Sequence, residues 1–232
     1  MALVLFLIIR TFVIEAFQIP TGSMERTLLA GDFLFVNKAV YGAQIPGTNA
    51  HLPGFQRPAR GDVIVFEYPK DPTLNYVKRV IGAPGDVVQM RGGQVFVNGE
   101  ELREPYVQPS DPLPDSYDSK FKWQHRYLDG FTHDQIRAYH PTRDTWGPLR
   151  VPHGKYFVLG DNRDESLDSR YWGFVPQENV IGRPLLIYWS VRSEEQDVPL
   201  SATPGDKLYH FAYAATHLFQ MTRWDRTFRI VK

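Results

Sequence analysis

The sequence predicts a mainly β protein: a folded antiparallel sheet or β-barrel-like domain, with an inserted loop-rich subdomain and an N-terminal apolar anchor helix. Gly-Asp pairs precede several runs of β-branched and aromatic residues. Glycine and aspartate supply turn geometry, and such side chains suit pleated, half-buried surfaces. The runs expected to form strands are 33–36, 63–66, 87–90, 94–97, 156–159 and 185–189. Gly92-Gly93 indicates a hairpin, and the spacing favours a barrel or folded sheet over βαβ units.

The composition excludes several classes of function. The 232 residues carry 26 basic and 26 acidic side chains, so the formal net charge is zero. A broad nucleic-acid-binding surface needs a basic excess, so we expect no nucleic-acid partner. Apolar residues make up 43% of the chain, which is too many for a disordered protein. The absence of cysteine excludes disulfide scaffolds, thiolate metal sites and a cysteine nucleophile.

The first 16 residues are the predicted anchor. Residues 2–9 are all apolar, and Arg10 then interrupts the run. The run is too short to cross a bilayer, which takes about 20 apolar residues. It also lacks the basic start and the small-residue cleavage site of a secretory signal peptide. A buried core helix is one interpretation. We favour the outer half of a membrane anchor whose start is missing, with Arg10 and Glu15 near the head groups.

Residues 101–150 interrupt the β pattern. Four prolines lie between 105 and 114, and a mixed polar and aromatic stretch follows them. Strand-like residues resume at 149–151, so an inserted loop-rich subdomain is expected at 101–150. The main β domain would then consist of 17–100 and 151–195.

The C-terminal tail, 196–232, contains a predicted amphipathic helix. Apolar residues from Leu208 to Phe219 recur at helical spacing, which favours a helix over 208–221 that packs on the β domain. Beyond it, Trp224, Phe228 and Val231 lie at i, i+4 and i+7 among basic residues. This end fits either an ordinary packed helix or a basic amphipathic segment on an anionic membrane surface.

The absence of cysteine leaves serine, threonine or lysine for covalent catalysis, and Ser23 is the first candidate. It ends the segment Phe-Gln-Ile-Pro-Thr-Gly-Ser at 17–23, in which Pro20 fixes the chain direction and Gly22 permits a close backbone approach. The run that follows is compatible with a helix, so Ser23 is either a helix N-cap or a nucleophile. Arg26 stands where a capping box would have Glu or Gln.

The second candidate is Lys78 in the predicted strand 74–81. Alternate residues of a strand share a face, so Lys78 shares one with Tyr76 and its neighbour Arg79 lies on the other. One of these two cations must therefore point toward an apolar or aromatic surface. Burial favours a neutral amine and can lower a lysine pKa by as much as 3–5 units, which would make it a general base near pH 7. A surface lysine with a buried stem is the alternative.

The third element is the densely polar segment 160–173, which follows a predicted strand. A calcium-binding loop of the EF-hand type does not fit, because counting from Asp161 puts Ser166 at position 6 and Trp172 at position 12. No other metal motif is apparent. A solvated loop remains possible. Alternatively, an ion pair between Asp168 and Arg170 would hold the loop and leave Ser166 free to hydrogen-bond inward.

Taken together and in this order, the three elements resemble the type I signal peptidases (leader peptidases) of bacteria. The matching segments cover about half of the chain, and the last one is highly specific. They are 19–24 with 27–29, 31–38, 60–66, 76–82 with 84–86, and 160–176.

The resemblance implies a serine–lysine dyad in which Ser23 is the nucleophile and Lys78 the general base. It implies that Ser166 orients the Lys78 amine, and that the Ser23 N–H and the Thr21 hydroxyl form an oxyanion hole. Many family members carry serine at the position of Thr21. Asp168 and Arg170 match a structural ion pair of the family, and we also expect a structural role near the site for Arg79.

The family's activity implies the rest of the function. The resemblance implies a membrane-bound serine endopeptidase that removes N-terminal signal peptides from exported preproteins. It implies cleavage after a small-x-small (Ala-x-Ala) motif, with no metal or cofactor. The catalytic domain would lie on the outer, periplasmic face of the bacterial cytoplasmic (inner) membrane. The implied partners are signal-peptide-bearing preproteins, membrane lipid and the secretion translocon.

An extended substrate would bind along a strand edge through backbone hydrogen bonds and side-chain pockets. Pockets formed by Ile19, Met24 and Val77 would suit alanine and disfavour large side chains. The expected substrate-binding residues are Phe17, Gln18, Ile19, Pro20, Met24, Tyr76 and Val77.

Two other classes of function compete with this interpretation. One is a catalytically inactive, membrane-anchored β scaffold that binds exported peptides, but every candidate catalytic position holds a competent residue. The other is a self-cleaving serine–lysine regulator of the repressor type, which would need a DNA-binding segment where this chain has an apolar N-terminus.

Overall fold

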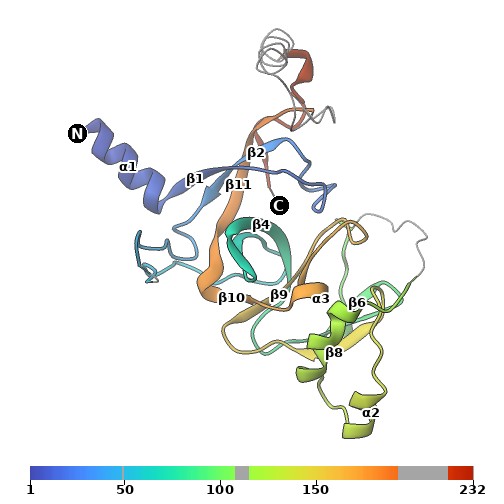
Figure 1. Ribbon diagram of the computed structural model, residues 1–232. Helices are drawn as coiled ribbons and strands as arrows, with labels where there is room; N and C mark the ends of the chain where they lie inside the picture. Colours follow the sequence, from blue (N-terminus) through green and yellow to red (C-terminus); the bar gives the residue numbers. More distant parts are fainter. Residues whose placement is uncertain (49, 108–114, 193–218, 232) are drawn as a thin grey trace, which may run out of the picture.

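The computed structural model describes residues 1–48, 50–107, 115–192 and 219–231, and its main body is an antiparallel sheet of eight strands (Figure 1). The strand order is β1-β2-β11-β3-β4-β9-β10, and β12 pairs with β11. This confirms the prediction of a mainly β, antiparallel fold. The strands are β1 (Ile14–Gln18), β2 (Asp32–Asn37), β3 (Val63–Tyr68), β4 (Asp71–Gly82), β9 (Lys155–Leu159), β10 (Val175–Pro176), β11 (Val180–Ser190) and β12 (Arg229–Ile230).

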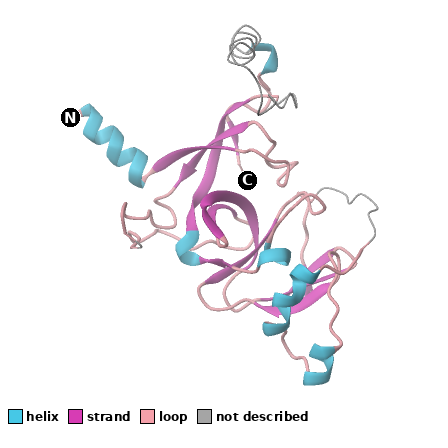
Figure 2. Cartoon of the chain, in the orientation of Figure 1, coloured by secondary structure: helices cyan, strands magenta, loops and turns pink. Residues whose placement is uncertain are grey.

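A second, smaller sheet has the order β7-β6-β5-β8. The hairpin predicted at Gly92-Gly93 joins β5 (Val87–Arg91) to β6 (Gln94–Val97), and β7 (Glu100–Glu101) follows. β8 (Trp146–Arg150) returns from the far end of the predicted insertion to pair with β5. Between β7 and β8 the described residues form loops and two short helices, η1 (Ser119–Arg126) and α2 (His133–Arg137) (Figure 2). Most of the predicted insertion is therefore loop-rich, although its last five residues belong to the small sheet.

The described residues contain three clusters of buried side chains, and one of them holds the two sheets together. The first joins the small sheet to the large one, because Val88 and Trp146 pack with Ile81 of β4 and Phe157 of β9. The second lies under the segment that follows β1 and contains Ile19, Met24 and Leu28 with residues of β2, β3 and β11. The third fills the other face of β3, β4 and β9 and includes Phe66, Tyr156 and Trp172. The second cluster forms the floor beneath Ser23.

The N-terminal residues form α1 (Ala2–Phe12), which leads into β1 and extends away from the sheet (Figure 1). None of its residues is buried, and its apolar side chains from Leu3 to Ile9 are all exposed. Within the described ranges, no helix is long and apolar enough to cross a membrane.

The described part of the tail differs from its predicted form. The helix predicted over 208–221 lies mostly outside the described residues. The expectation of a helical amphipathic end beyond Arg223 is wrong, because residues 224–228 form turns and β12 pairs with β11. Phe228 has a φ of 65°, which a helix does not allow. Strand pairing and the burial of Val231 outweigh the helical spacing of the apolar residues.

The first cluster generates a test of the contact between the sheets. Leu149 of β8 is fully buried there, so Leu149→Ala should lower the free energy of unfolding by about 2–5 kcal/mol through lost burial and a residual cavity. Urea denaturation in detergent measures this change, and Leu52→Ala, at a 42% exposed position, is the matched control. Equal stabilities of the two variants would contradict the description of this core.

Candidate active site

Ser23 lies in a turn-rich loop directly after β1. No helix follows it: the Glu25 N–H donates to the Gly22 carbonyl at 2.9 Å, the Leu28 N–H donates to the Met24 carbonyl at 2.7 Å, and Arg26 has a φ of 75°. Ser23 therefore caps no helix, and the helix-compatible run predicted after it forms successive turns. Met24 and Leu28 are fully buried on this loop, which leaves Ser23 at the surface of the core.

Lys78, from β4, meets Ser23 across the site. Its Nζ donates to Ser23 Oγ at 2.7 Å and to the Val77 carbonyl at 3.0 Å, and the residue is only 4% exposed. The alternative of a surface lysine is wrong, because the amine itself is buried and not only its stem. The Tyr76 ring, on the same face of the strand, lies 5.5 Å from Nζ.

The surroundings of Lys78 favour its neutral form. Burial lowers the pKa of Lys78 to about 8, because the ammonium form loses its hydration. The carboxylates of Asp168 and Asp161 oppose this shift, whereas the positive charge of Arg170 adds to it. A substantial fraction of the amine is therefore neutral slightly above neutral pH, and in that form Nζ can accept the proton of the Ser23 hydroxyl across the same 2.7 Å contact.

Thr21 and Ser166 lie beside this pair in different ways. Thr21 Oγ1 is 3.5 Å from Ser23 Oγ, at the limit of a hydrogen bond. The Ser166 hydroxyl is buried and makes no hydrogen bond to any of the described residues, Lys78 included. It lies near Asp168, close enough to lower the pKa of that carboxyl without the geometry of a full hydrogen bond. Its predicted role in orienting Lys78 stays a prediction.

The loop 160–170 is held by the predicted pair of Asp168 and Arg170. The guanidinium donates to both carboxylate oxygens, each at 2.9 Å, and both residues are fully buried. Asp168 also accepts from the Gly160 N–H at 3.2 Å. Burial alone would raise the pKa of Asp168, but Arg170 and these hydrogen bonds lower it, so the carboxylate stays ionised. The loop therefore has a buried, internally neutralised centre.

Arg79 faces away from Lys78, as strand alternation predicts, and forms a second buried ion pair. Its Nε and Nη2 donate to Asp161 at 2.9 and 2.8 Å, and Nη1 donates to the Gly61 carbonyl at 2.7 Å. The guanidinium carbon lies 3.9 Å from the centre of the Tyr106 ring. Asp161 also accepts from the Thr27 hydroxyl at 2.5 Å, so this pair joins the loop 160–170 to the turn after Ser23.

Several contacts at the site were missed by the sequence analysis. The Asn162 N–H donates to the Ser23 carbonyl at 3.2 Å, and its side-chain amide donates to the Gly22 carbonyl at 3.3 Å. Arg163 forms a buried bidentate pair with Glu104, at the start of the predicted insertion. Gly160 has no room for a Cβ, because Ser166 and the Ser23 carbonyl occupy that space. The polar density of 160–173 was the only available signal, since long-range partners cannot be inferred from spacing.

A cavity of about 260 Å³ opens beside Ser23 and Lys78, between β1 and the first half of β4. β1 ends the large sheet, and β4 pairs with β9 only from Arg79 onward, so both strands have free edges here. All seven predicted substrate-binding residues line it, and the structure adds Asn75, Val65, Glu165 and Leu167. The predicted seven are Phe17, Gln18, Ile19, Pro20, Met24, Tyr76 and Val77.

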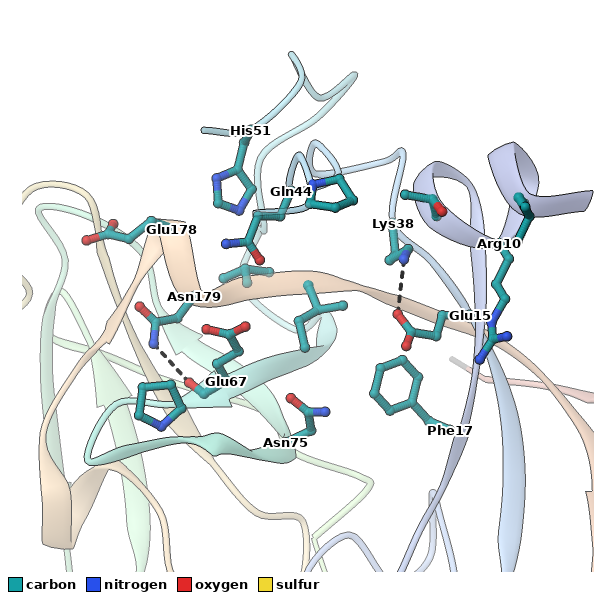
Figure 3. A pocket seen from close by; sticks show the side chains of 16 residues that line it. Arg10, Glu15, Phe17, Lys38, Gln44, His51, Glu67, Asn75, Glu178 and Asn179 are labelled. Carbon is teal, nitrogen blue, oxygen red and sulfur yellow. Dashed lines mark hydrogen bonds and ion pairs between the residues drawn. The ribbon is translucent and has the colours of Figure 1, made fainter. Parts of the chain in front are cut away.

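A second, more polar cavity of about 500 Å³ adjoins the first (Figure 3). Phe17 and Asn75 line both cavities. One wall carries the ion pair of Lys38 with Glu15, at 3.0 Å, and Glu67 lies on the opposite side (Figure 3). Within the described residues, no group of three His, Asp or Glu side chains is placed to hold a metal ion. The smaller cavity contains Ser23, and the larger one, which shares Phe17 and Asn75 with it, reaches Leu7, Arg10 and Thr11 at the end of α1.

Comparisons with known proteins agree with the motifs. The family model described as signal peptidase, peptidase S26, matches residues 1–189. Signal peptidase I of Pseudomonas fluorescens is 40% identical over 198 residues, which cover 79% of this chain and 68% of the relative. Signal peptidase I of Aquifex aeolicus is 34% identical over 230 residues, which cover 84% and 85%. A crystal structure of a signal peptidase I from Enterococcus faecalis is 34% identical and covers 55% of this chain and 97% of its own, with a TM-score of 0.37.

The buried ion pair generates a stability test with an internal control. Asp168→Asn removes the negative charge and leaves the Arg170 guanidinium buried and unpaired. We expect the free energy of unfolding to fall by about 3–5 kcal/mol. Asp129→Asn breaks the exposed pair with Arg150 and should cost at most about 1 kcal/mol. Denaturant titration of both variants measures the contrast, and an Asp168→Asn protein as stable as the control would refute the role of the pair.

Proposed function

This chain belongs to the signal peptidase family S26, and from that premise we propose that buried Lys78 activates Ser23 to cut exported preproteins after a small-x-small motif. The chain is a serine peptidase of the signal peptidase I type, a family that removes signal peptides. The observation that carries the proposal is the 2.7 Å hydrogen bond between Lys78 Nζ and Ser23 Oγ in a buried setting.

The geometry supports a two-step acyl transfer. Neutral Lys78 accepts the Ser23 proton as Oγ attacks the scissile carbonyl, which gives a tetrahedral oxyanion and an ammonium group. The ammonium then donates its proton to the leaving amine, so the peptide bond breaks and an acyl-enzyme remains. In the second step Lys78 takes a proton from water as the water oxygen attacks the acyl carbonyl. The ester bond to Oγ then breaks, the signal peptide leaves with a new carboxyl end, and the Lys78 ammonium returns the proton to Ser23 Oγ. One group with a pKa of about 8 can serve both as base and as acid.

We assign the oxyanion hole to the backbone N–H of Ser23 and the hydroxyl of Thr21. The Ser23 N–H shares a peptide unit with the Gly22 carbonyl, which accepts from the Asn162 side-chain amide at 3.3 Å and from the Glu25 N–H at 2.9 Å, so these two contacts fix its orientation. The Thr21 hydroxyl lies next to Oγ and can turn toward an oxyanion that forms there. A donor of this kind contributes roughly 2.7–4 kcal/mol of transition-state stabilisation.

The substrate would bind as an extended strand between the free edges of β1 and β4. The smaller cavity, with Ile19, Met24 and Val77 on its walls, would take the small side chains just before the cut. Residues further upstream would continue into the polar cavity past Phe17 and Asn75. That cavity lies next to α1, the end of the molecule from which we expect a membrane-held signal peptide to approach (Figure 3).

Exposed apolar side chains support contact with a membrane. The apolar residues of α1 from Leu3 to Ile9 are exposed, as are Phe35 of β2 and Leu185 of β11 in the large sheet. Phe35 stacks on Tyr188 with ring centres 4.3 Å apart. Exposed aromatic side chains are typical of the interface between lipid and water. We propose that these exposed residues rest on the outer, periplasmic side of the bacterial cytoplasmic membrane, and contact with the translocon stays a prediction from the resemblance.

The inactive scaffold is the second candidate, since the free strand edges would bind a peptide even without catalysis. The short Lys78–Ser23 contact favours the enzyme, because burial of a lysine beside a serine serves no peptide-binding purpose. The match of the family model to 1–189 disfavours a repressor-type regulator.

The catalytic pair is tested by Ser23→Ala and Lys78→Ala. Each should abolish cleavage of a preprotein whose signal ends in Ala-x-Ala, because the nucleophile or its base is lost. Product formation on gels in detergent measures this, with Lys70→Ala and Ser116→Ala as exposed controls. Circular dichroism checks folding. Full cleavage by either dyad variant contradicts the mechanism, and efficient cutting after a large final residue such as phenylalanine contradicts the assignment of the cavity.

The pH dependence follows from the pKa of Lys78. Only the neutral amine accepts the serine proton, and the pKa is lowered, so kcat/KM of the wild-type protein should rise with pH through about 8 and then level off. A lysine of ordinary pKa would still be protonated there. Initial rates between about pH 6 and 10, with a substrate that does not titrate in this range, measure the profile. A rate that stays constant or falls between pH 7 and 9 contradicts a neutral lysine base.

A further inference from the structure

Arg226 lies in the tail, outside the residues matched by the family model, yet it contacts the loop that carries Ser23. We propose that Arg226 is a positioning residue that holds the Ser23 loop in its reactive geometry through its contacts with Asp32 and the Thr27 carbonyl. This inference rests on the proposed function, because it assigns to the tail a part in the same catalytic site.

The guanidinium of Arg226 is almost completely buried, at 5% exposure. Nη2 and Nε donate to the two carboxylate oxygens of Asp32 at 2.6 and 3.2 Å. Nη2 also donates to the Thr27 carbonyl at 3.1 Å. Arg226 therefore contacts the Ser23 loop at two points, one in its middle and one at its end.

Asp32 closes the base of this loop. Its carbonyl accepts from the Ile19 N–H at 2.8 Å, while the Gly31 N–H donates to the Ile19 carbonyl at 2.8 Å, so residues 19 and 31–32 form a closed neck. The fully buried Asp32 carboxylate accepts further bonds from the Leu29 N–H at 2.8 Å and the Ser190 hydroxyl at 2.6 Å. Arg226 neutralises the negative charge of Asp32, the carboxylate to which Leu29 and Ser190 donate where the two ends of the loop meet.

Thr27 connects this support to the catalytic loop. Its carbonyl accepts from Arg226, and its hydroxyl donates to Asp161 at 2.5 Å. The next residue, Asn162, binds the carbonyls of Ser23 and Gly22. Hydrogen bonds thus link Arg226 to Thr27 and Thr27 to Asp161, and the residue bonded to Asp161 in the chain, Asn162, binds the peptide units on both sides of Ser23.

The tail is itself fixed at several points, so it can act as a rigid support. The Arg223 guanidinium donates to the Ala30 carbonyl at 2.9 Å, β12 pairs with β11, and Val231 packs in the same cluster as Ile19 and Met24. The Ser23 loop has only turns and no regular secondary structure, so such contacts decide its conformation. A displacement of the nucleophile by 1 Å is enough to reduce a rate by about 100-fold.

The test compares kinetics of the full-length protein with Arg226→Ala and Arg226→Lys. We expect Arg226→Ala to lower kcat by about 100-fold with KM nearly unchanged, because the substrate cavity is intact and Ser23 is displaced. The midpoint of the pH profile should stay near 8, since Lys78 is untouched. Arg226→Lys keeps the charge beside Asp32 without the forked donors, so its kcat should be intermediate. Guanidinium ion, added well below unfolding concentrations, should restore part of the kcat of Arg226→Ala.

The control is Arg229→Ala, an exposed position in β12 of the same tail, which should keep the kcat of the wild-type protein. If Arg226→Ala proves too unstable, Arg226→Lys is assayed below its unfolding temperature, where a wild-type kcat would overturn the proposal. A stable Arg226→Ala protein with wild-type kcat, or a loss that guanidinium does not restore, overturns it as well. Loss of cleavage in Ser23→Ala with unchanged kcat in Arg226→Ala would leave the proposed function intact and reject only the positioning role.

Discussion

The structure depends on keeping a lysine amine out of water beside a serine hydroxyl. Burial makes the ammonium form of Lys78 costly, but the nearby carboxylates of Asp168 and Asp161 stabilise that form, so both carboxylates must be paired if the pKa of Lys78 is to stay low. Both are paired, Asp168 with Arg170 and Asp161 with Arg79, and each ion pair satisfies its own charge. An unpaired carboxylate at either position would raise the pKa of Lys78 and favour its ammonium form.

Strand geometry makes this arrangement possible. Adjacent residues of β4 point to opposite faces, so one strand supplies both the buried amine of Lys78 and the guanidinium of Arg79. The amine faces Ser23 and the substrate cavity, whereas the guanidinium faces Asp161 and the turn at Thr27. The proposed base, Lys78, and the structural cation, Arg79, are thereby separated by the sheet itself, although they are neighbours in the sequence.

The sequence patterns predicted correctly the features that depend only on residues close together in the chain. The strands, the hairpin at Gly92-Gly93 and the placement of Lys78 and Arg79 on opposite faces followed from alternation and turn chemistry. The pairing of Ser23 with Lys78 came from motif resemblance, because 55 residues separate them and no spacing rule connects them. The turns after Ser23 and the strand at Arg229 were missed, since contacts with Asp161, Asp32 and β11 override helical spacing there. The partners of Asn162 and Arg226 are equally long-range, so no local signal could have revealed them.

A protease that acts on extended polypeptides has to meet two opposed requirements. The catalytic base must be shielded from water, but the cleft must admit a flexible chain whose backbone is polar. Here the free edges of β1 and β4 can satisfy the substrate's backbone groups as it enters, so the entering chain would replace water without leaving those groups unpaired. The entering chain would also displace water from the cavity that Lys78 lines, so the 4% of this residue that is still exposed would lose its contact with solvent. Substrate binding and activation of the base are therefore expected to be coupled, which would favour catalysis only when a peptide fills the cavity.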